Sequence, residues 1–245
     1  MLSLSVTELR KDYPQKPRAL DGLSLDLSPG ILGLLGPNGA GKSTLMRILA
    51  TVAKPTSGQV LWNGRDVVRN PNPLREVLGY LPQDFGIYPN LNAVEFLEYL
   101  AAVRGIERAT ARKRIDDLLV LVNLVEARKR PLSGYSGGMR QRIGICQALL
   151  NEPELLIVDE PTVGLDPEER VRFRDLLGEM RGERIVILST HIVSDVEAIA
   201  TEIAIVAEGR LLARGTTADL IRQASVSSLE DAYLHFVKSA RASAA

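Results

Sequence analysis

The chain has 245 residues, which suits one hydrophobic core with an added subdomain better than several independent domains. Lysine plus arginine and aspartate plus glutamate number 30 each, so no net charge attracts the molecule to nucleic acid or to an anionic bilayer. The longest uncharged stretch, Leu27 to Gly41, contains two prolines and several glycines, which excludes a membrane-spanning helix of about 20 apolar residues.

The N-terminal part of the chain predicts a small antiparallel β layer. Leu2 to Leu27 alternates apolar and polar residues in two short runs, and Pro14 to Pro17 separates these runs. Gln59 to Trp62, flanked by Ser-Gly and Asn-Gly pairs, is expected to be an edge strand of the same layer. This layer is expected to flank the first motif of the chain.

A glycine-rich loop lies between the apolar run Ile31 to Leu35 and a helical pattern that starts at Leu45. The phosphate-loop motif G-x-x-x-x-G-K-[ST] requires this context of strand, loop and helix. Its glycines let successive N–H groups point at a polyphosphate, Lys42 reaches the β- and γ-phosphates, and the Ser43 hydroxyl binds Mg²⁺. The alternative is a turn that begins a helix and binds nothing. The expected nucleotide-binding residues are Gly36, Pro37, Asn38, Gly39, Ala40, Gly41, Lys42, Ser43 and Thr44.

The middle of the chain predicts helices. Leu91 to Val103 and Ala111 to Val125 carry apolar residues at helical spacing, which indicates a helical subdomain over about residues 85–150. The basic run Arg128 to Arg130 is expected to complement a helix dipole in solvent rather than to bind phosphate. Cys146 is expected to be a small buried hydrophobic residue, and a single cysteine, which cannot form an internal disulfide, suits a reducing cytoplasm.

Two adjacent acids end the apolar run Leu155 to Val158. Downstream of a phosphate loop, the first acid, Asp159, is expected to hold the metal from the side opposite Ser43. The second, Glu160, is expected to polarise the water that attacks the γ-phosphate, whereas the alternative is a glutamate that forms a salt bridge at a strand end.

The remaining part of the chain alternates apolar strands and helices, which predicts a parallel sheet buried on both faces. Residues 207–213 predict a terminal hairpin, the chain after Thr217 predicts two helices, and Ser239 to Ala245 is expected to be frayed. The fold class is α/β: a P-loop NTPase with a mostly parallel central sheet, an N-terminal antiparallel β layer and an α-helical subdomain. The predicted elements of this part are Leu155–Val158, Pro167–Met180, Ile185–Leu188, Val193–Ala200 and Ile203–Val206.

A turn of small residues, Ser136, Gly137 and Gly138, opens the apolar helix predicted from Ile143. Its free N–H groups and its hydroxyl could bind phosphate oxygens, although the chain already has a phosphate loop, so the turn alone is weak evidence of function. With the phosphate loop upstream and the two acids downstream, the segment resembles the signature of the ATP-binding-cassette (ABC) superfamily. The resemblance covers Leu2 to about Thr216. It implies an ABC ATPase domain over residues 1–220, with the helical subdomain inserted, and a short helical tail over residues 221–245.

The resemblance implies that two cassettes meet head to tail around two ATP, with the signature of one closing over the ATP of the other. Gln83 resembles the hinge glutamine that senses Mg²⁺ and the attacking water; without the family it would be an exposed loop residue. Asp166 resembles the loop that crosses the dimer interface, a role compatible with capping a helix. His191 resembles the switch histidine at the γ-phosphate. Tyr13 resembles the aromatic residue that stacks on adenine, and otherwise it would be a turn tyrosine.

Tyr135 and Met139 stand where the commonest signature has Leu and Gln. Together with the segments Gln83 to Pro89 and Leu229 to Tyr233, they resemble the bacterial cassettes that energise separate permeases, often as exporters. The implied partners are a second ABC ATPase subunit, as a homodimer, and a transmembrane permease that docks around residues 84–88, with no nucleic acid. The implied location is cytoplasmic, on the inner face of the cell membrane. The alternative is a soluble ABC ATPase that acts on nucleic acid or the ribosome. A P-loop GTPase is excluded because the Asn-Lys-x-Asp motif is absent.

Overall fold

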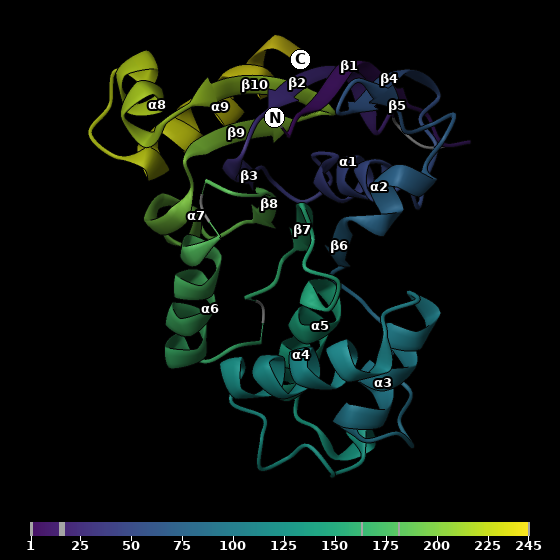
Figure 1. Ribbon diagram of the computed structural model, residues 1–245. Helices are drawn as coiled ribbons and strands as arrows, with labels where there is room; N and C mark the ends of the chain where they lie inside the picture. The colour runs from purple at the N-terminus through teal and green to yellow at the C-terminus, as the bar shows by residue number, and fades with distance from the viewer. Residues whose placement is uncertain (1, 15–17, 163, 181, 245) are drawn as a thin grey trace.

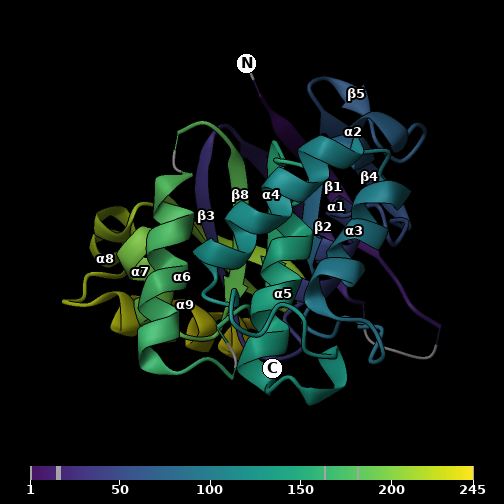
Figure 2. The ribbon, with the colours of Figure 1, turned by 60° about the horizontal axis from the view of Figure 1, so that its bottom comes forward.

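The computed structural model describes residues 2–14, 18–162, 164–180 and 182–244 (Figure 1). Two sheets fill one half of the molecule, and helices α3, α4 and α5 form the other half. The turned view brings these three helices forward, with α6 beside them (Figure 2). This arrangement agrees with the expected fold class, a P-loop NTPase with an added helical subdomain.

The smaller sheet is antiparallel and has the strand order β2-β1-β4-β5. The expected antiparallel pair within Leu2 to Leu27 is confirmed as β1 and β2. The expectation that Gln59 to Trp62 is an edge strand is wrong, because β5 pairs beyond it. Asn63 and Gly64 both have positive φ, which produces the tight two-residue turn that folds the chain back. The strands are β1 (Leu4–Lys11), β2 (Leu20–Leu27), β4 (Ser57–Trp62) and β5 (Arg65–Asp66).

The larger sheet has the order β10-β9-β3-β8-β7-β6, and every neighbouring pair except β9 and β10 is parallel. All residues of β3, β7 and β8 are buried, which confirms the predicted sheet with two covered faces. Strand β6 was not predicted, because four residues are too short to show a periodic pattern. The strands are β3 (Gly30–Leu35), β6 (Leu78–Leu81), β7 (Leu155–Asp159), β8 (Ile185–Thr190), β9 (Glu202–Ala207) and β10 (Arg210–Gly215).

Helix α1 lies between the two sheets, and its apolar residues share one core with both of them. The opposite face of the larger sheet packs against the helical subdomain and α6. Cys146 is fully buried in that second core, as expected. The helices up to α6 are α1 (Lys42–Leu49), α2 (Asn72–Glu76), α3 (Ala93–Val103), α4 (Arg108–Leu121), α5 (Gly137–Leu149) and α6 (Pro167–Glu179), with a 3₁₀ turn, η1, at Leu132–Gly134.

A third core joins β9 and β10 to α7 (Val193–Ile199), α8 (Thr217–Ala224) and α9 (Leu229–Ala244). The expected boundary after residue 220 falls inside α8, so the predicted tail is continuous with the last helices of the fold. Helix α9 extends to Ala244, where a frayed end was expected. None of the helices in the described part of the chain has the length and the apolar character that a membrane span requires.

Candidate nucleotide-binding site

Four segments meet at the carboxyl edge of the larger sheet because each follows a parallel strand. The phosphate loop follows β3, Gln83 follows β6, Asp159 ends β7 and His191 follows β8. The β7 and β8 register pairs Asp159 with Ser189. Open α/β sheets bind ligands in the crevice at this edge. Strand β6, missed in the sequence, is what brings Gln83 there.

A cavity of about 460 Å³ opens over the phosphate loop, a volume typical of small-molecule sites. Every expected nucleotide-binding residue of the loop except Gly36 lines it, together with Gln83 and Glu160. The lining residues are Ala19, Pro37, Asn38, Gly39, Ala40, Gly41, Lys42, Ser43, Thr44, Gln83 and Glu160.

Backbone geometry explains the glycines of the loop. A Cβ at Gly36 would lie 2.2 Å from the carbonyl oxygen of Val206, and one at Gly41 would lie 2.4 Å from that of Ala19. Gly41 also has φ of 101°, in the left-handed region that glycine tolerates. Within the described residues no side chain caps α1, so the N–H groups of its first turn remain available to an anion.

Lys42 is held over the loop by the backbone itself. Its Nζ donates to the carbonyl oxygens of Gly36 at 2.5 Å and Pro37 at 3.3 Å. The residue is only 7% exposed, and this burial lowers the pKa of Lys42 from its usual value, while the negative charges of Glu160 and Asp159 act in the opposite direction. A buried ammonium group at the cavity favours the binding of phosphate oxygens.

The two acids at the end of β7, Asp159 and Glu160, have different contacts. Asp159 is buried and accepts a hydrogen bond from the Ser189 hydroxyl. Glu160 is 8% exposed and has φ of 52°, a strained left-handed conformation for a residue with a side chain. Its N–H donates to the Ser189 carbonyl at 3.0 Å, and its Oε2 lies 2.9 Å from Nδ1 of His191. The geometry therefore pairs a buried carboxylate at the cavity with a histidine that is 57% exposed.

Other predicted site residues lie outside the cavity lining. Ser136 and Gly137 are exposed, and the Ser136 hydroxyl accepts a hydrogen bond from the Met139 N–H at 3.2 Å, as the cap of α5. Asp166 is exposed and caps α6, accepting from the Glu169 N–H at 2.9 Å. The structure thus places both predicted caps at helix starts and away from the phosphate loop of the same chain.

Tyr13 is half-buried and also lies outside the lining residues. The Nζ of Lys11 stands over its ring, 5.0 Å from the centroid. One π face of the Tyr13 ring is therefore covered by the ammonium group of Lys11.

Two contacts outside the cavity lining had no signal in the sequence. Arg142 of α5 forms an ion pair with Glu169 of α6 at 3.0 Å, and the Glu169 carboxylate lies against the backbone of Gly138. The Thr162 hydroxyl donates to the buried carboxylate of Asp195 at 2.9 Å. Both pairs join residues far apart in the chain, so no local pattern could reveal them.

Comparisons with known proteins agree with this geometry. The model of the ABC transporter family matches residues 20–163. A daunorubicin resistance ATP-binding protein of Streptomyces coeruleorubidus is 37% identical over 220 residues, which cover 89% of this chain and 69% of that protein. A linearmycin resistance ATP-binding protein of Bacillus subtilis strain 168 is 34% identical over 96% of this chain and 79% of its own length.

A solved ATP-binding subunit of an ABC transporter has a TM-score of 0.87 and 30% identity, covering 95% of this chain and 98% of that chain. The chain therefore belongs to the ABC transporter family, as an ATP-binding subunit that hydrolyses ATP.

Proposed function

We propose that two copies of this chain dimerise head to tail around two ATP and drive a separate transmembrane permease in export. The observation that carries the proposal is the convergence of Lys42, Glu160 and the loop N–H groups on one cavity, while the signature residues remain outside it. The chain thus holds one half of a site for ATP and presents, elsewhere, the other half to a partner. The drug resistance named for both relatives supports export.

Lys42 and the N–H groups of the loop bind the β- and γ-phosphates. Ser43 and Gln83 line the cavity, and Asp159 lies outside its lining at the end of β7, next to Glu160; these three oxygen donors would hold Mg²⁺ together with phosphate oxygens, because this ion uses few carboxylates and prefers oxygen ligands. Phosphate oxygens of ATP would complete the ligand set. The ion supplies charge neutralisation at the phosphates.

Glu160 is the group that polarises the attacking water. Its side chain lines the cavity, and its backbone is in the left-handed conformation. His191 holds this carboxylate through Nδ1 and, being exposed, can reach the γ-phosphate with its other ring nitrogen. Tyr13 stacks on adenine.

The partner's ATP is contacted by Ser136, Gly137 and Gly138, and Asp166 lies at the interface between the copies. The exposure of Ser136, Gly137 and Asp166 supports these roles. The permease docks around residues 84–88, where Tyr88 is half exposed and packs edge-on against Tyr99, with ring centroids 5.4 Å apart. The complex therefore lies on the cytoplasmic face of the cell membrane. The balance of acidic and basic residues supports the absence of a nucleic-acid partner.

The test is the variant Glu160→Gln. ATP hydrolysis should fall by about 10²- to 10⁴-fold, the usual contribution of a general base, while ATP binding persists. With ATP present, light scattering should then detect a stable dimer. Glu197→Gln, on the exposed face of α7, serves as the matched control and should hydrolyse ATP at the parent rate.

Parent-rate hydrolysis by Glu160→Gln would contradict the role of the carboxylate, and a variant that stays monomeric with ATP would contradict the dimer. Purification of the tagged chain from detergent-solubilised membranes of its host tests the permease. A polytopic membrane protein in stoichiometric amount supports the proposal, whereas ribosomal or DNA-bound partners without a permease would contradict it.

A further inference from the structure

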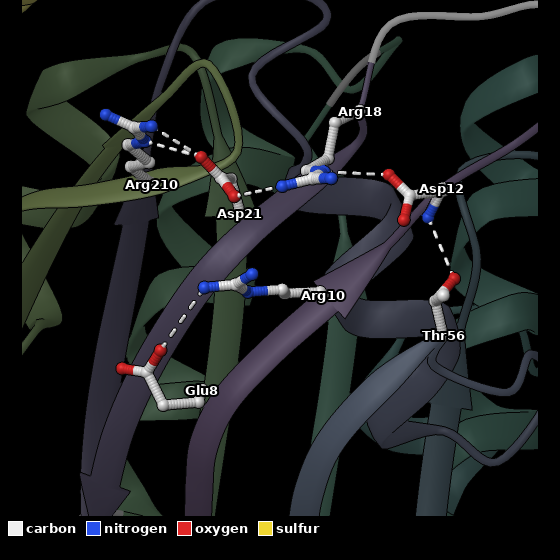
Figure 3. Close-up of polar contacts among 7 residues, drawn as sticks. All are labelled: Glu8, Arg10, Asp12, Arg18, Asp21, Thr56 and Arg210. Carbon is white, nitrogen blue, oxygen red and sulfur yellow. Dashed lines mark hydrogen bonds and ion pairs between the residues drawn. The ribbon is translucent and has the colours of Figure 1, made fainter.

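A chain of ion pairs connects Arg210 with residues 12–21, which are distant from it in the sequence (Figure 3). Arg210 of β10 donates from Nε and Nη2 to Oδ2 of Asp21 on β2, at 2.8 and 2.5 Å. Arg18 donates from Nη1 to the other oxygen of Asp21 at 2.7 Å and from Nε to Asp12 at 2.8 Å. The four side chains therefore form one continuous connection from β10 to the end of β1.

One end of this connection is attached to the phosphate loop. The turn between β9 and β10 donates from the Gly209 N–H to the Ala40 carbonyl at 3.0 Å and accepts at the Gly209 carbonyl from the Asp21 N–H at 2.9 Å. A Cβ at Gly209 would lie 2.9 Å from the Ala19 carbonyl oxygen, and φ there is 74°. Arg210 therefore follows a turn that is packed tightly against the loop and β2.

The other end of the connection is next to Tyr13. Asp12 is held on two sides, because its carboxylate accepts from Arg18 and its N–H donates to the Thr56 hydroxyl at 3.0 Å (Figure 3). Lys11, on the other side of Asp12, donates from Nζ to the Lys54 carbonyl at 2.8 Å and stands over the Tyr13 ring. The contacts of Asp12 thus fix the position of the backbone next to Tyr13.

The carboxylate of Asp21 is at the centre of the connection and accepts from both arginines. The Asp21 side chain is 19% exposed, and its hydrogen bonds from Arg18 and then Arg210 lower its pKa to about 2. Exposed ion pairs of this kind contribute little to global stability. We therefore expect the pairs of Asp21 to affect the relative positions of the segments that they join.

We propose that Arg210 is a positioning residue for the adenine end of ATP. Through Asp21 and Arg18 it sets the distance between the segment that carries Tyr13 and the phosphate loop. The inference rests on the proposed contact of Tyr13 with adenine. It makes the β9–β10 turn, far from the adenine-binding segment in sequence, part of the machinery that distinguishes ATP from a bare polyphosphate.

The experiment compares the binding of ATP and of inorganic tripolyphosphate by calorimetry. Arg210→Ala should raise the Kd and KM for ATP by about two- to fivefold, the range of an exposed ion pair, and should leave kcat and the tripolyphosphate Kd unchanged. Arg210→Lys should restore part of the ATP affinity. The matched control is Arg214→Ala on the same strand, which loses an ion pair with Glu202 and should bind both ligands like the parent.

Equal weakening of ATP and tripolyphosphate in Arg210→Ala would overturn the inference, because the residue would then act on the phosphate loop. The variant Tyr13→Ala separates the remaining outcomes. If Tyr13→Ala weakens ATP binding and Arg210→Ala does not, the inference is wrong and the adenine contact stands. If neither variant affects ATP binding, the proposed contact of Tyr13 fails, and the inference fails with it.

Discussion

Gly33 in β3 decides how closely α7 approaches the central sheet. A Cβ at this position would lie 2.0 Å from Cγ1 of Val196, whereas ordinary contact begins at 3.4 Å, so Gly33→Ala requires a displacement of about 1.4 Å. Val196 is fully buried and β-branched, and such a side chain has one strongly preferred rotamer in a helix. Helix α7 must therefore move away from β3.

Overpacking of a core costs about 1–3 kcal/mol, and this close approach belongs in the upper part of that range, about 2–3 kcal/mol. Replacing glycine by alanine in a strand gains about 0.5–1 kcal/mol, so the net loss is about 1–2.5 kcal/mol. For a chain of this size the expected fall in Tm is about 2–10 °C.

Thermal unfolding followed by circular dichroism measures this change. Gly178→Ala is the matched control, because a Cβ there would have no described atom within 4 Å apart from its chain neighbours and the backbone of its own helix, and its Tm should stay equal or rise. The double variant with Val196→Ala should lose less stability than the sum of the two single variants, with an interaction energy of about 0.5–3 kcal/mol. A Tm for Gly33→Ala at or above that of the parent, or strict additivity in the cycle, would refute the steric argument.

Lys42→Ala should weaken ATP binding by about ten- to a hundredfold in calorimetry, because it removes a charged donor to the phosphates. The thiol of Cys146 should not react with a thiol-specific reagent until the protein unfolds, since burial raises its pKa to about 12; fast labelling of the native protein would contradict this. Thr162→Val should lower the free energy of unfolding by about 1–3 kcal/mol in a denaturant titration, because buried Asp195 loses its donor; unchanged stability would argue against that hydrogen bond. The pKa of Asp21 falls from 3.8 to about 2 on folding, so its contribution to stability is present above pH 3.8 and is lost as the pH falls toward 2. An NMR titration of the Asp21 carboxyl group should therefore give a pKa below 3.8, and a pKa at or above 3.8 would contradict the assigned ion pairs.

Local sequence patterns were sufficient for those parts of the site that a few consecutive residues build. The phosphate loop is determined by glycines whose positions in the motif suit the backbone, and Ser136 and Asp166 cap helices within three residues of their own position. Strands β3, β7 and β8 were predictable because both of their faces are buried, which requires an uninterrupted apolar run.

Short elements gave too little pattern. Strand β6 has four residues, and β5 has two, so neither could be distinguished from a loop. For this reason the sequence placed Gln59 to Trp62 at an edge and did not show why Gln83 reaches the phosphate loop.

The sequence by itself therefore determined the nucleotide chemistry of this protein, because motif residues must be close in the chain to share one loop or one strand end. Only the tertiary structure decided which distant groups meet: Glu160 with His191, Arg142 with Glu169, and Arg210 with Asp21. These pairs depend on strand order and helix packing, which arise from the burial of apolar surface across the whole chain. Their side chains carry no periodic signal, and so they become visible only when the fold brings them within hydrogen-bond distance.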